Sequence, residues 1–245
     1  MTGKRADNRD QAASTGKGEV ATGGFRYYGR RQGRPFSAAQ KAALAAGLAR
    51  FGIPDGTRPL SLETMFGAPV ARAALEIGFG DGEHLIWQAA HHADTGFVGV
   101  EPFRTGVLHL LEKIEAGGCE NIRVFPGDAR ALMSRLPVSA FERIFVLFPD
   151  PWPKTRHHKR RLINHATLEE FARLLKPGGE LRLATDHADY LAWILAHMAA
   201  RPEFLWLAEH ARDWRERPPD WPPTRYEAKA ASAGRRAIYL TYRRR

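Results

Sequence analysis

A single carboxylate stands between prolines in the segment 149–154, which reads Pro-Asp-Pro-Trp-Pro-Lys. Proline fixes its own φ angle and pushes the preceding residue out of the helical region, so Asp150 lies on stiff, extended backbone. The segment follows a β-prone run at 142–148, and a rigid strand end suits a catalytic group. Prolines also terminate edge strands, but that alternative leaves the neighbouring acid, Trp and Lys unexplained. We therefore predict that Asp150 is a catalytic residue.

A glycine-rich segment follows an earlier β-prone run and is a second candidate site. The run 72–77 leads directly into Gly78-Phe79-Gly80-Asp81-Gly82. Glycine allows sharp turns and a close approach to a ligand, although a plain tight turn would need the same residues. The dinucleotide fingerprint G-x-G-x-x-G would require a third glycine at 83, where Glu83 stands. This spacing argues against a dehydrogenase that uses NAD.

Acidic residues mark the ends of three successive β-prone runs. Glu76 ends the first run, Glu101 ends the second, and Asp128 follows the third. Glu101 stands where related dinucleotide folds place an acid that accepts hydrogen bonds from ribose hydroxyls. Asp128 is placed within reach of an adenine amino group. Each acid alone is more often a surface group or a helix cap, but together they indicate an adenosyl ligand. Their charge favours ammonium and sulfonium groups and repels a pyrophosphate.

A strongly basic run at 155–161, Thr-Arg-His-His-Lys-Arg-Arg, comes directly after the proline-rich segment. Charge runs are usually solvated surface, and adjacent histidines without Cys or acidic partners make a poor metal site, so we predict no metal. Beside a candidate active site, contact with nucleic-acid phosphates is the better interpretation. The residues predicted to contact RNA are Arg156, His157, His158, Lys159, Arg160 and Arg161. A basic arm at 25–35 carries aromatic residues and either tracks RNA or only solubilises the chain.

Short β-prone runs alternate with helical segments from Arg72 onward, which is typical of a parallel sheet covered on both faces. The predicted strands are 72–77, 96–101, 121–125, 142–148, 179–185, 204–209 and 236–242. The predicted helices are 38–51, which begins after Ser37 and ends at Gly52, and then 83–92, 103–116, 129–135, 164–175 and 187–200. This indicates a doubly wound, seven-stranded, mostly parallel α/β sheet whose last strand is antiparallel. We expect one domain over 25–245 after a disordered tail at 1–24.

The bulk composition limits the class of protein. The 245 residues include 37 Lys and Arg against 27 Asp and Glu, a net charge of +10 that favours an anionic partner. No stretch approaches the roughly 20 apolar residues that a bilayer requires, and no secretory signal is visible. Cys119 is the only cysteine, so no internal disulfide is expected. We predict a cytoplasmic protein that does not bind membranes.

Several separated motifs resemble the bacterial tRNA (guanine-N7-)-methyltransferase family, from about Arg26 to Tyr242. They are Glu76-Ile77-Gly78-Phe79-Gly80-Asp81-Gly82, Val100-Glu101-Pro102, Phe148 to Lys154 with His158 to Arg161, Ala184-Thr185-Asp186 before Tyr190, and Thr224-Arg225-Tyr226-Glu227. The resemblance implies a Rossmann-like class I methyltransferase fold, S-adenosyl-L-methionine as methyl donor, and a guanine in the tRNA variable loop as acceptor. The cofactor contacts that it implies, together with those argued above, are Glu76, Gly78, Gly80, Glu101, Asp128 and Asp150. The implied substrate contacts are Lys154, Asp186, Thr224, Arg225, Tyr226 and Glu227.

The chemistry of guanine N7 agrees with these residues. N7 carries a free lone pair, so no base has to remove a proton before methyl transfer. Positive charge develops on the ring, and Asp150 either stabilises that charge or accepts hydrogen bonds from guanine N1 and N2 and so orients N7. Lys154 would reach O6 or a phosphate, and Asp186 and Glu227 are further acceptors for guanine donors. Thr224 is either a substrate contact or an ordinary helix cap.

Two alternatives besides the dehydrogenase stay open. One is another class I nucleic-acid methyltransferase, for example one that methylates an adenine amine, although such sites place Asn or Asp before two consecutive prolines and an aromatic residue. The other is a non-catalytic tRNA-binding protein with the same fold, which the acids at the strand ends argue against. No surface for an obligate protein partner is evident in the sequence.

Overall fold

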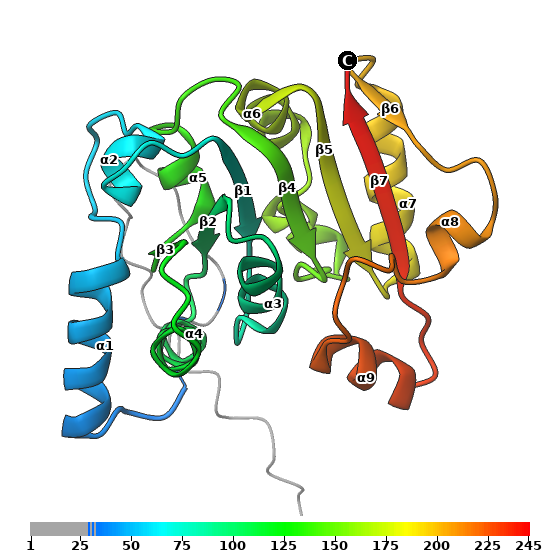
Figure 1. Ribbon diagram of the computed structural model, residues 1–245. Helices are drawn as coiled ribbons and strands as arrows, with labels where there is room; N and C mark the ends of the chain where they lie inside the picture. The colour runs from blue at the N-terminus through cyan, green and yellow to red at the C-terminus, as the bar shows by residue number, and fades with distance from the viewer. Residues whose placement is uncertain (1–28, 30, 32) are drawn as a thin grey trace, which may run out of the picture.

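The computed structural model describes residue 29, residue 31 and residues 33–245, so the predicted tail and most of the predicted arm lie outside its description. A seven-stranded sheet forms its centre, with the strand order β3-β2-β1-β4-β5-β7-β6 (Figure 1). All neighbouring strands are parallel except for β7, which runs antiparallel to both β5 and β6. The predicted fold class is confirmed.

The strands are β1 (Arg72–Ile77), β2 (Thr95–Val100), β3 (Ile122–Phe125), β4 (Phe141–Leu147), β5 (Leu175–Thr185), β6 (Phe204–Trp206) and β7 (Ile238–Arg244). The longer helices are α1 (Ala38–Phe51), α3 (Glu83–His91), α4 (Arg104–Gly117), α6 (His165–Leu174), α7 (Ala188–Ala199) and α9 (Arg225–Ser232). The short ones are α2 (Leu62–Phe66), α5 (Ala129–Met133), the 3-10 helix η1 (Thr155–Arg160) and α8 (Arg212–Arg215).

Local capping chemistry explains where α1 begins and ends. The Ser37 hydroxyl accepts a hydrogen bond from the Gln40 amide, and the Gln40 side chain accepts one from the Ser37 amide, so the two residues form a capping box. At the other end, a Cβ on Gly52 would lie 2.3 Å from the Leu48 carbonyl oxygen, so no larger residue fits there. The predicted bounds of this helix are confirmed.

Segments without a long apolar period were harder to predict. The short helices α2, η1 and α8 and the helix α9 were not predicted from periodicity. The predicted strand 204–209 is only Phe204–Trp206, because its ladder with β7 ends at the pair Trp206 and Tyr242. The predicted strand 179–185 begins earlier, at Leu175, where the chain pairs with Phe141 of β4.

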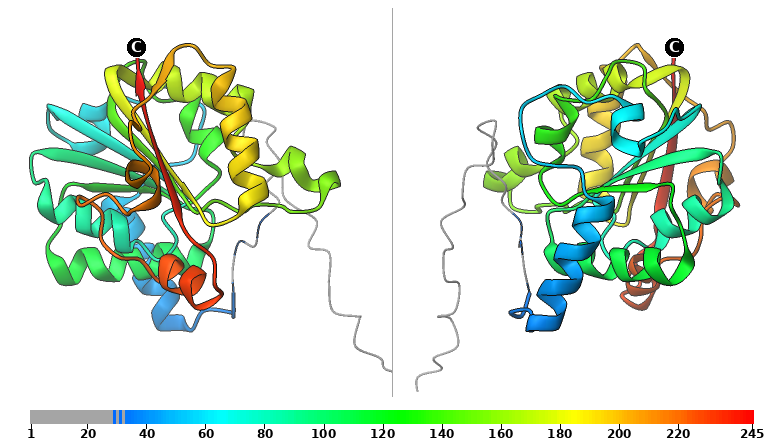
Figure 2. Two further views of the ribbon diagram at one scale, coloured as in Figure 1. Left: turned by 90° about the vertical axis from the view of Figure 1, so that its right-hand side faces the viewer. Right: turned by 60° about the vertical axis from the view of Figure 1, so that its left-hand side comes forward.

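Helices cover both faces of the sheet (Figure 2), and two apolar cores lie between these helices and the sheet. One core packs α5, α6 and α7 against the sheet, with Phe171 and Ile194 fully buried in it. The other packs α1, α3 and α4 against the opposite face, with Leu85 and Leu111 buried there. Within the described part of the chain, no helix is long and apolar enough to cross a bilayer.

The strand order reverses between β1 and β4, which are neighbours although β2 and β3 lie between them in sequence. In open parallel sheets, ligands bind beyond the carboxyl ends of the strands at such a switch point. The glycine-rich segment follows β1, and the proline-rich segment follows β4. The topology therefore brings the two candidate sites together.

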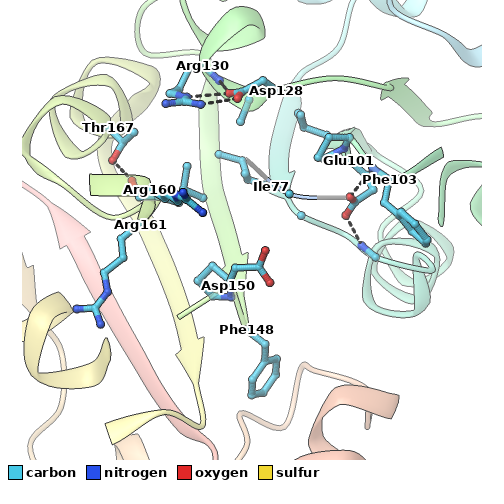
Figure 3. Close-up of a pocket in the computed structure, with 18 of the residues that line it drawn as sticks. Ile77, Glu101, Phe103, Asp128, Arg130, Phe148, Asp150, Arg160, Arg161 and Thr167 are labelled. Carbon is cyan, nitrogen blue, oxygen red and sulfur yellow. Dashed lines mark hydrogen bonds and ion pairs between the residues drawn. The ribbon is translucent and has the colours of Figure 1, made fainter. Parts of the chain in front are cut away.

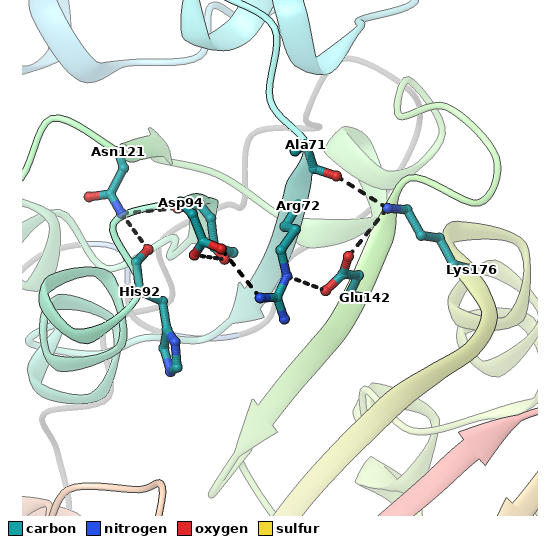
Figure 4. Close-up of polar contacts among 8 residues, drawn as sticks. Ala71, Arg72, His92, Asp94, Asn121, Glu142 and Lys176 are labelled. Carbon is teal, nitrogen blue, oxygen red and sulfur yellow. Dashed lines mark hydrogen bonds and ion pairs between the residues drawn. The ribbon is translucent and has the colours of Figure 1, made fainter.

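The opposite edge of the sheet is held by polar contacts among strand beginnings (Figure 4). Arg72 of β1 donates to Glu142 of β4 over 2.9 Å and lies 3.3 Å from Asp94, just before β2. Lys176 of β5 lies 3.5 Å from Glu142. These contacts tie together the amino ends of four strands, away from the candidate sites.

Candidate active site

The glycine-rich loop is held against the end of β2 by Glu101. The Gly80 amide donates to one oxygen of Glu101 over 2.9 Å, and the Phe103 amide donates to the other over 2.8 Å. Burial raises the pKa of Glu101, and the two amide donors oppose that shift. A carboxylate has about four lone-pair positions, so Glu101 keeps acceptor capacity toward the cleft.

Gly106 of α4 is a residue that the sequence reasoning missed. A Cβ at this position would lie 2.2 Å from the Gly80 carbonyl oxygen, so only glycine lets α4 pack directly against the loop. Gly78 and Gly80 both have positive φ, 78° and 58°, a conformation that glycine adopts without strain. The loop is therefore shaped by its own glycines and by one on the neighbouring helix.

Glu76 is buried beneath this loop rather than on the main cleft. Its carboxylate is 3% exposed and lies 2.7 Å from His84 Nδ1. Gln88 continues the chain of contacts, with its amide nitrogen 3.2 Å from His84 Nε2 and donating to the Asp220 carbonyl over 2.6 Å. Glu76 lines a smaller recess together with Phe148 and Thr224. The predicted contact between Glu76 and a cofactor remains a prediction.

Asp128 lines the main cleft and also caps α5 as its N-cap residue. One of its oxygens accepts from the Arg130 amide over 2.9 Å, and the Arg130 guanidinium lies 2.6 Å from the other oxygen. Asp128 is therefore a helix cap, as the alternative had it. Its position on the cleft also allows it to contact a ligand there.

The cleft itself has a volume of about 320 Å³ and opens at the carboxyl ends of β1, β2 and β4 (Figure 3). Glu101, Asp128 and Asp150 all line it, together with Gly78 and Gly80. Asp150 directs its carboxyl group into this space (Figure 3). The side chain is accessible from the cleft, and partial burial by its surroundings raises its pKa. The structure thus brings the predicted catalytic acid to the predicted adenosyl site.

The backbone around Asp150 is strained. Phe148 and Trp152 adopt positive φ angles of 51° and 44°, a left-handed conformation that costs about 1–3 kcal/mol for a residue with a side chain. The Phe148 amide donates to Ala184 of β5 over 2.8 Å, which anchors the start of the segment. Phe148 also lines the cleft, a role that its position before Pro149 did not reveal.

Of the four predicted substrate residues at 224–227, at the start of α9, only one lies on the main cleft. Tyr226 lines the cleft, and its ring lies nearly parallel to that of Phe148, with centroids 6.3 Å apart and an interplanar angle of 8°. Thr224 caps the helix and Glu227 completes the capping box, so the helix-cap alternative holds for Thr224. Arg225 pairs with Asp81 and lies 2.8 Å from Glu83, beside the glycine-rich loop.

Five of the six predicted substrate residues lie off the main cleft: Thr224 and Arg225, already described, and Lys154, Asp186 and Glu227. Lys154 is exposed at the start of η1. Asp186 forms an ion pair with Arg235 over 2.7 Å. Glu227 accepts hydrogen bonds from the Thr224 amide over 2.8 Å and from the Tyr239 hydroxyl. Direct contact of Asp186 or Glu227 with a substrate remains a prediction. It requires each carboxylate to bind the substrate and its present partner at the same time.

The basic run divides into an exposed part and a buried end. Arg156 and Lys159 of η1 are exposed, His157 and His158 are half-buried, and the Arg160 guanidinium lies 5.0 Å from the centre of the Trp152 ring. Arg161 is 2% exposed. Only part of the predicted phosphate track is therefore accessible. No group of three metal-ligating side chains occurs among the residues that the structure describes.

Part of the N-terminal arm that the structure describes reaches the same cleft. The Arg31 carbonyl accepts a hydrogen bond from the Arg104 amide over 2.8 Å, and Gly29 lines the cleft. Asn164 and Thr167 of the α6 start also line it. Their sequence signal was only that of a helix cap.

Comparison with known proteins identifies the family. Residues 71–240 match the family described as "Putative methyltransferase". A tRNA (guanine-N(7)-)-methyltransferase of Rhodospirillum rubrum is 49% identical over 93% of this chain and 91% of its own length. One from Rhizobium meliloti is 44% identical, covering 93% of this chain and 98% of the relative. The chain belongs to the tRNA (guanine-N(7)-)-methyltransferase family. The resemblance seen in its motifs is confirmed.

Membership of the tRNA (guanine-N(7)-)-methyltransferase family removes one alternative. A dehydrogenase is excluded, in agreement with Glu83 standing where the dinucleotide fingerprint requires glycine. In this family member, Glu101, Asp128 and the proline-rich segment meet in one cleft.

Proposed function

We propose that this chain transfers the methyl group of S-adenosyl-L-methionine to N7 of a guanine in the variable loop of tRNA, forming 7-methylguanosine. The observation that carries the proposal is the shared cleft of Asp150, Glu101 and Asp128 at the switch point of the sheet. The names of the relatives at 44–49% identity support the choice of base and atom. Because tRNA is a cytoplasmic substrate, we place the enzyme in the cytoplasm.

The residues of the cleft fit the methyl donor. Its volume of about 320 Å³ is within the usual range of small-molecule sites, roughly 300–1,000 Å³. A Cβ on Gly78 would meet no atom within 4 Å, so the bare loop backbone leaves open space at the edge of the cleft. Glu101 would accept from ribose hydroxyls, and Asp128 would accept from the adenine amine. Glu76 would act on the ammonium end of the ligand from beneath the loop.

The chemistry requires little from the protein beyond placement and charge. When bound, S-adenosyl-L-methionine supplies a methyl group on a sulfonium sulfur, and the S–C bond breaks as the C–N7 bond forms. No proton has to leave guanine. The Asp150 carboxylate either stabilises the positive charge that develops on the guanine ring or accepts from N1 and N2 to orient the base. Phe148 and Tyr226 supply apolar faces on the same cleft for the base.

The exposed cations next to the cleft suit the phosphates of a folded RNA. Lys154, Arg156 and Lys159 project from the segment that follows the catalytic loop. Together with a net charge of +10, they provide an attraction that depends on salt rather than on sequence. Lys154 lies off the cleft, so its position favours a phosphate over guanine O6.

The proposal is tested by incubating the protein with unmodified tRNA transcript and methyl-labelled S-adenosyl-L-methionine, followed by nucleoside analysis. The expected product is labelled 7-methylguanosine from the variable loop. Labelled methyladenosine would establish the adenine-amine alternative, and tRNA binding without any transfer would establish the non-catalytic one. Either result would overturn the proposal.

A further inference from the structure

Arg161, the last residue of the basic run, turns away from solvent. Its side chain is 1% exposed, and its Nε donates to the Pro151 carbonyl over 2.9 Å. Its Nη2 pairs with the Asp189 carboxylate at the start of α7. Figure 3 shows the guanidinium pointing away from the Asp150 carboxyl group. Arg161 thus connects Pro151, the residue that follows Asp150, with helix α7.

Aromatic rings enclose the Arg161 guanidinium. Its central carbon lies 5.1 Å from the centre of the Tyr190 ring and 4.9 Å from that of Trp193, both on α7. These rings are themselves fixed, because the Tyr190 hydroxyl accepts from the Ile163 amide over 3.2 Å and Trp193 Nε1 donates to the Ile163 carbonyl over 2.6 Å. A buried cation is costly unless it is paired and hydrogen-bonded, and here it is both. Arg161 is therefore built into the structure rather than presented to a phosphate.

The proline-rich segment needs an outside donor of this kind. Pro149, Pro151 and Pro153 have no amide N–H, so three of the five residues 149–153 cannot donate a backbone hydrogen bond. Two amides, of Asp150 and Trp152, and the backbone carbonyl groups remain as places where the rest of the protein can hydrogen-bond to the loop. The Pro151 carbonyl immediately follows Asp150, and Arg161 is bonded to it.

We infer that Arg161, held by Asp189, is a positioning residue that fixes the Pro151 carbonyl and thereby the Asp150 carboxyl group for the proposed methyl transfer. The inference rests on the proposed function. A displacement of about 1 Å at a reacting group can cost on the order of 100-fold in rate, so one misplaced carbonyl is enough to matter. Neither Arg161 nor Asp189 needs to touch tRNA for this role.

The decisive variant is Asp189→Asn, which keeps the shape of the side chain and removes its charge. Asp189 is itself 55% exposed and lies on α7, so the protein is expected to fold, with a lower melting temperature because the buried Arg161 loses its charged partner. Loss of one charged partner of a hydrogen bond should lower kcat by roughly 10-fold, with KM for tRNA and for S-adenosyl-L-methionine within about two-fold of wild type. The dependence of tRNA binding on salt concentration should not change.

Variants of Arg161 add a rescue and a coupling test. Arg161→Gln should lower kcat by up to about 100-fold, while Arg161→Lys keeps the charge opposite Asp189 and should recover part of the loss. The combined Arg161→Gln and Asp189→Asn variant should be no slower than Arg161→Gln alone, because both changes act through one contact. Lys159→Gln, at an exposed residue of the same basic segment, is the matched control. It should raise KM for tRNA and flatten the salt dependence of tRNA binding.

Three outcomes are informative. If Asp189→Asn and Arg161→Gln behave like Lys159→Gln, with weaker tRNA binding and a flatter salt slope, Arg161 is an RNA contact and the inference is wrong. If Arg161→Gln does not fold by thermal melting, Asp189→Asn decides alone, and an unchanged kcat overturns the inference. Wild type and Asp150→Ala are measured in the same assay, so failure of wild type to form 7-methylguanosine identifies a failure of the proposed function instead.

Discussion

At the scale of single residues, the site depends on how the chain presents Asp150. The two aromatic residues with positive φ, Phe148 and Trp152, stand two positions before and after it. Such conformations persist only where the surrounding structure enforces them, and they cluster at functional sites. Three contacts hold the segment here. They are the hydrogen bonds of β4 to its neighbours, the Arg160 contact with Trp152 and the Arg161 hydrogen bond to Pro151. The strain is consistent with a loop held for chemistry.

The charge of Asp150 should be required for turnover. We expect Asp150→Asn to lower the rate of methyl transfer by roughly 10²–10³-fold, the usual effect of removing one preorganised group that stabilises developing charge. The thermal melting temperature should be nearly unchanged, because the side chain faces the cleft. Single-turnover kinetics with labelled donor measures the effect. A variant with full activity would remove Asp150 from the mechanism.

The same carboxylate should control the acid side of the pH profile. Burial raises the pKa of Asp150, so the group loses its charge at a higher pH than a free aspartate, whose pKa is about 3.9. Since the proposed role needs the ionised form, kcat/KM should fall as the pH decreases through that raised pKa. Glu101 also has a raised pKa and lines the same cleft. The comparison of wild type with Asp150→Asn separates the two, because only the Asp150 contribution disappears in the variant.

The Tyr226 side chain should contribute to tRNA binding through the face of its ring rather than through its hydroxyl group. It is 55% exposed and lies nearly parallel to Phe148, so it packs little core. Stacking of a base on an aromatic side chain contributes about 1–3 kcal/mol, so Tyr226→Ala should lower kcat/KM for tRNA by roughly 10-fold or more. Tyr226→Phe should remain close to wild type. Equal losses in both variants would show that the hydroxyl group, not the ring, is needed.

At the scale of elements, α9 matters because its first turn holds Tyr226 at the cleft. Its start is fixed by the Thr224 and Glu227 capping box, by the Tyr239 hydroxyl, and by the ion pairs of Arg225 with the glycine-rich loop. This helix is short and mostly polar, and only Ala230 is buried in it. Its capping box and its contacts with distant residues, rather than a large buried apolar face, therefore place it.

Removing the cap of α9 should loosen the helix. Thr224→Ala deletes the hydroxyl that accepts from the Glu227 amide, which typically costs about 1 kcal/mol. Hydrogen exchange of the amides in residues 225–232 should become faster, and methyl transfer should decrease because Tyr226 is held less firmly. Thr224→Ser keeps the hydroxyl and should behave like wild type. If the serine variant were as impaired as the alanine variant, the threonine methyl group would be the relevant feature.

At the scale of the whole molecule, charged side chains that join strands lie at one edge of the sheet, and those of the proposed active site lie at the other. The amino edge carries paired charges such as Arg72 with Glu142, which join neighbouring strands. The carboxyl edge carries the acids of the cleft and, beside it, the exposed cations of η1. The exposed cations of η1 thus place positive charge on the side of the molecule that holds the proposed active site.

Tightness of tRNA binding should depend on salt through the exposed cations. We expect the combined Lys154→Gln, Arg156→Gln and Lys159→Gln variant to bind tRNA more weakly and to reduce the slope of log Kobs against log salt by up to about 0.9 per lost phosphate contact. Filter binding over a range of salt concentrations measures this slope. A slope equal to that of wild type would show that tRNA docks on another surface.

Much of the architecture was determined by the sequence alone. The alternation of β-prone and helical segments predicts the mostly parallel sheet, because each period is set by which side chains must face the core. The Ser37 cap predicts where α1 begins, because local hydrogen bonding decides it. The acids at strand ends were found for a similar reason, since parallel strands bring their carboxyl ends to one edge.

Only the tertiary structure decided which charged side chains meet ligands and which meet each other. Arg161 and Lys159 belong to one basic run, yet Lys159 is exposed and Arg161 is buried, because Asp189 and two rings 28 or more positions away complete a site around it. Asp186 and Glu227 likewise have partners that local sequence does not reveal. Contacts between distant residues depend on how elements pack, and a local pattern of charge does not contain that information.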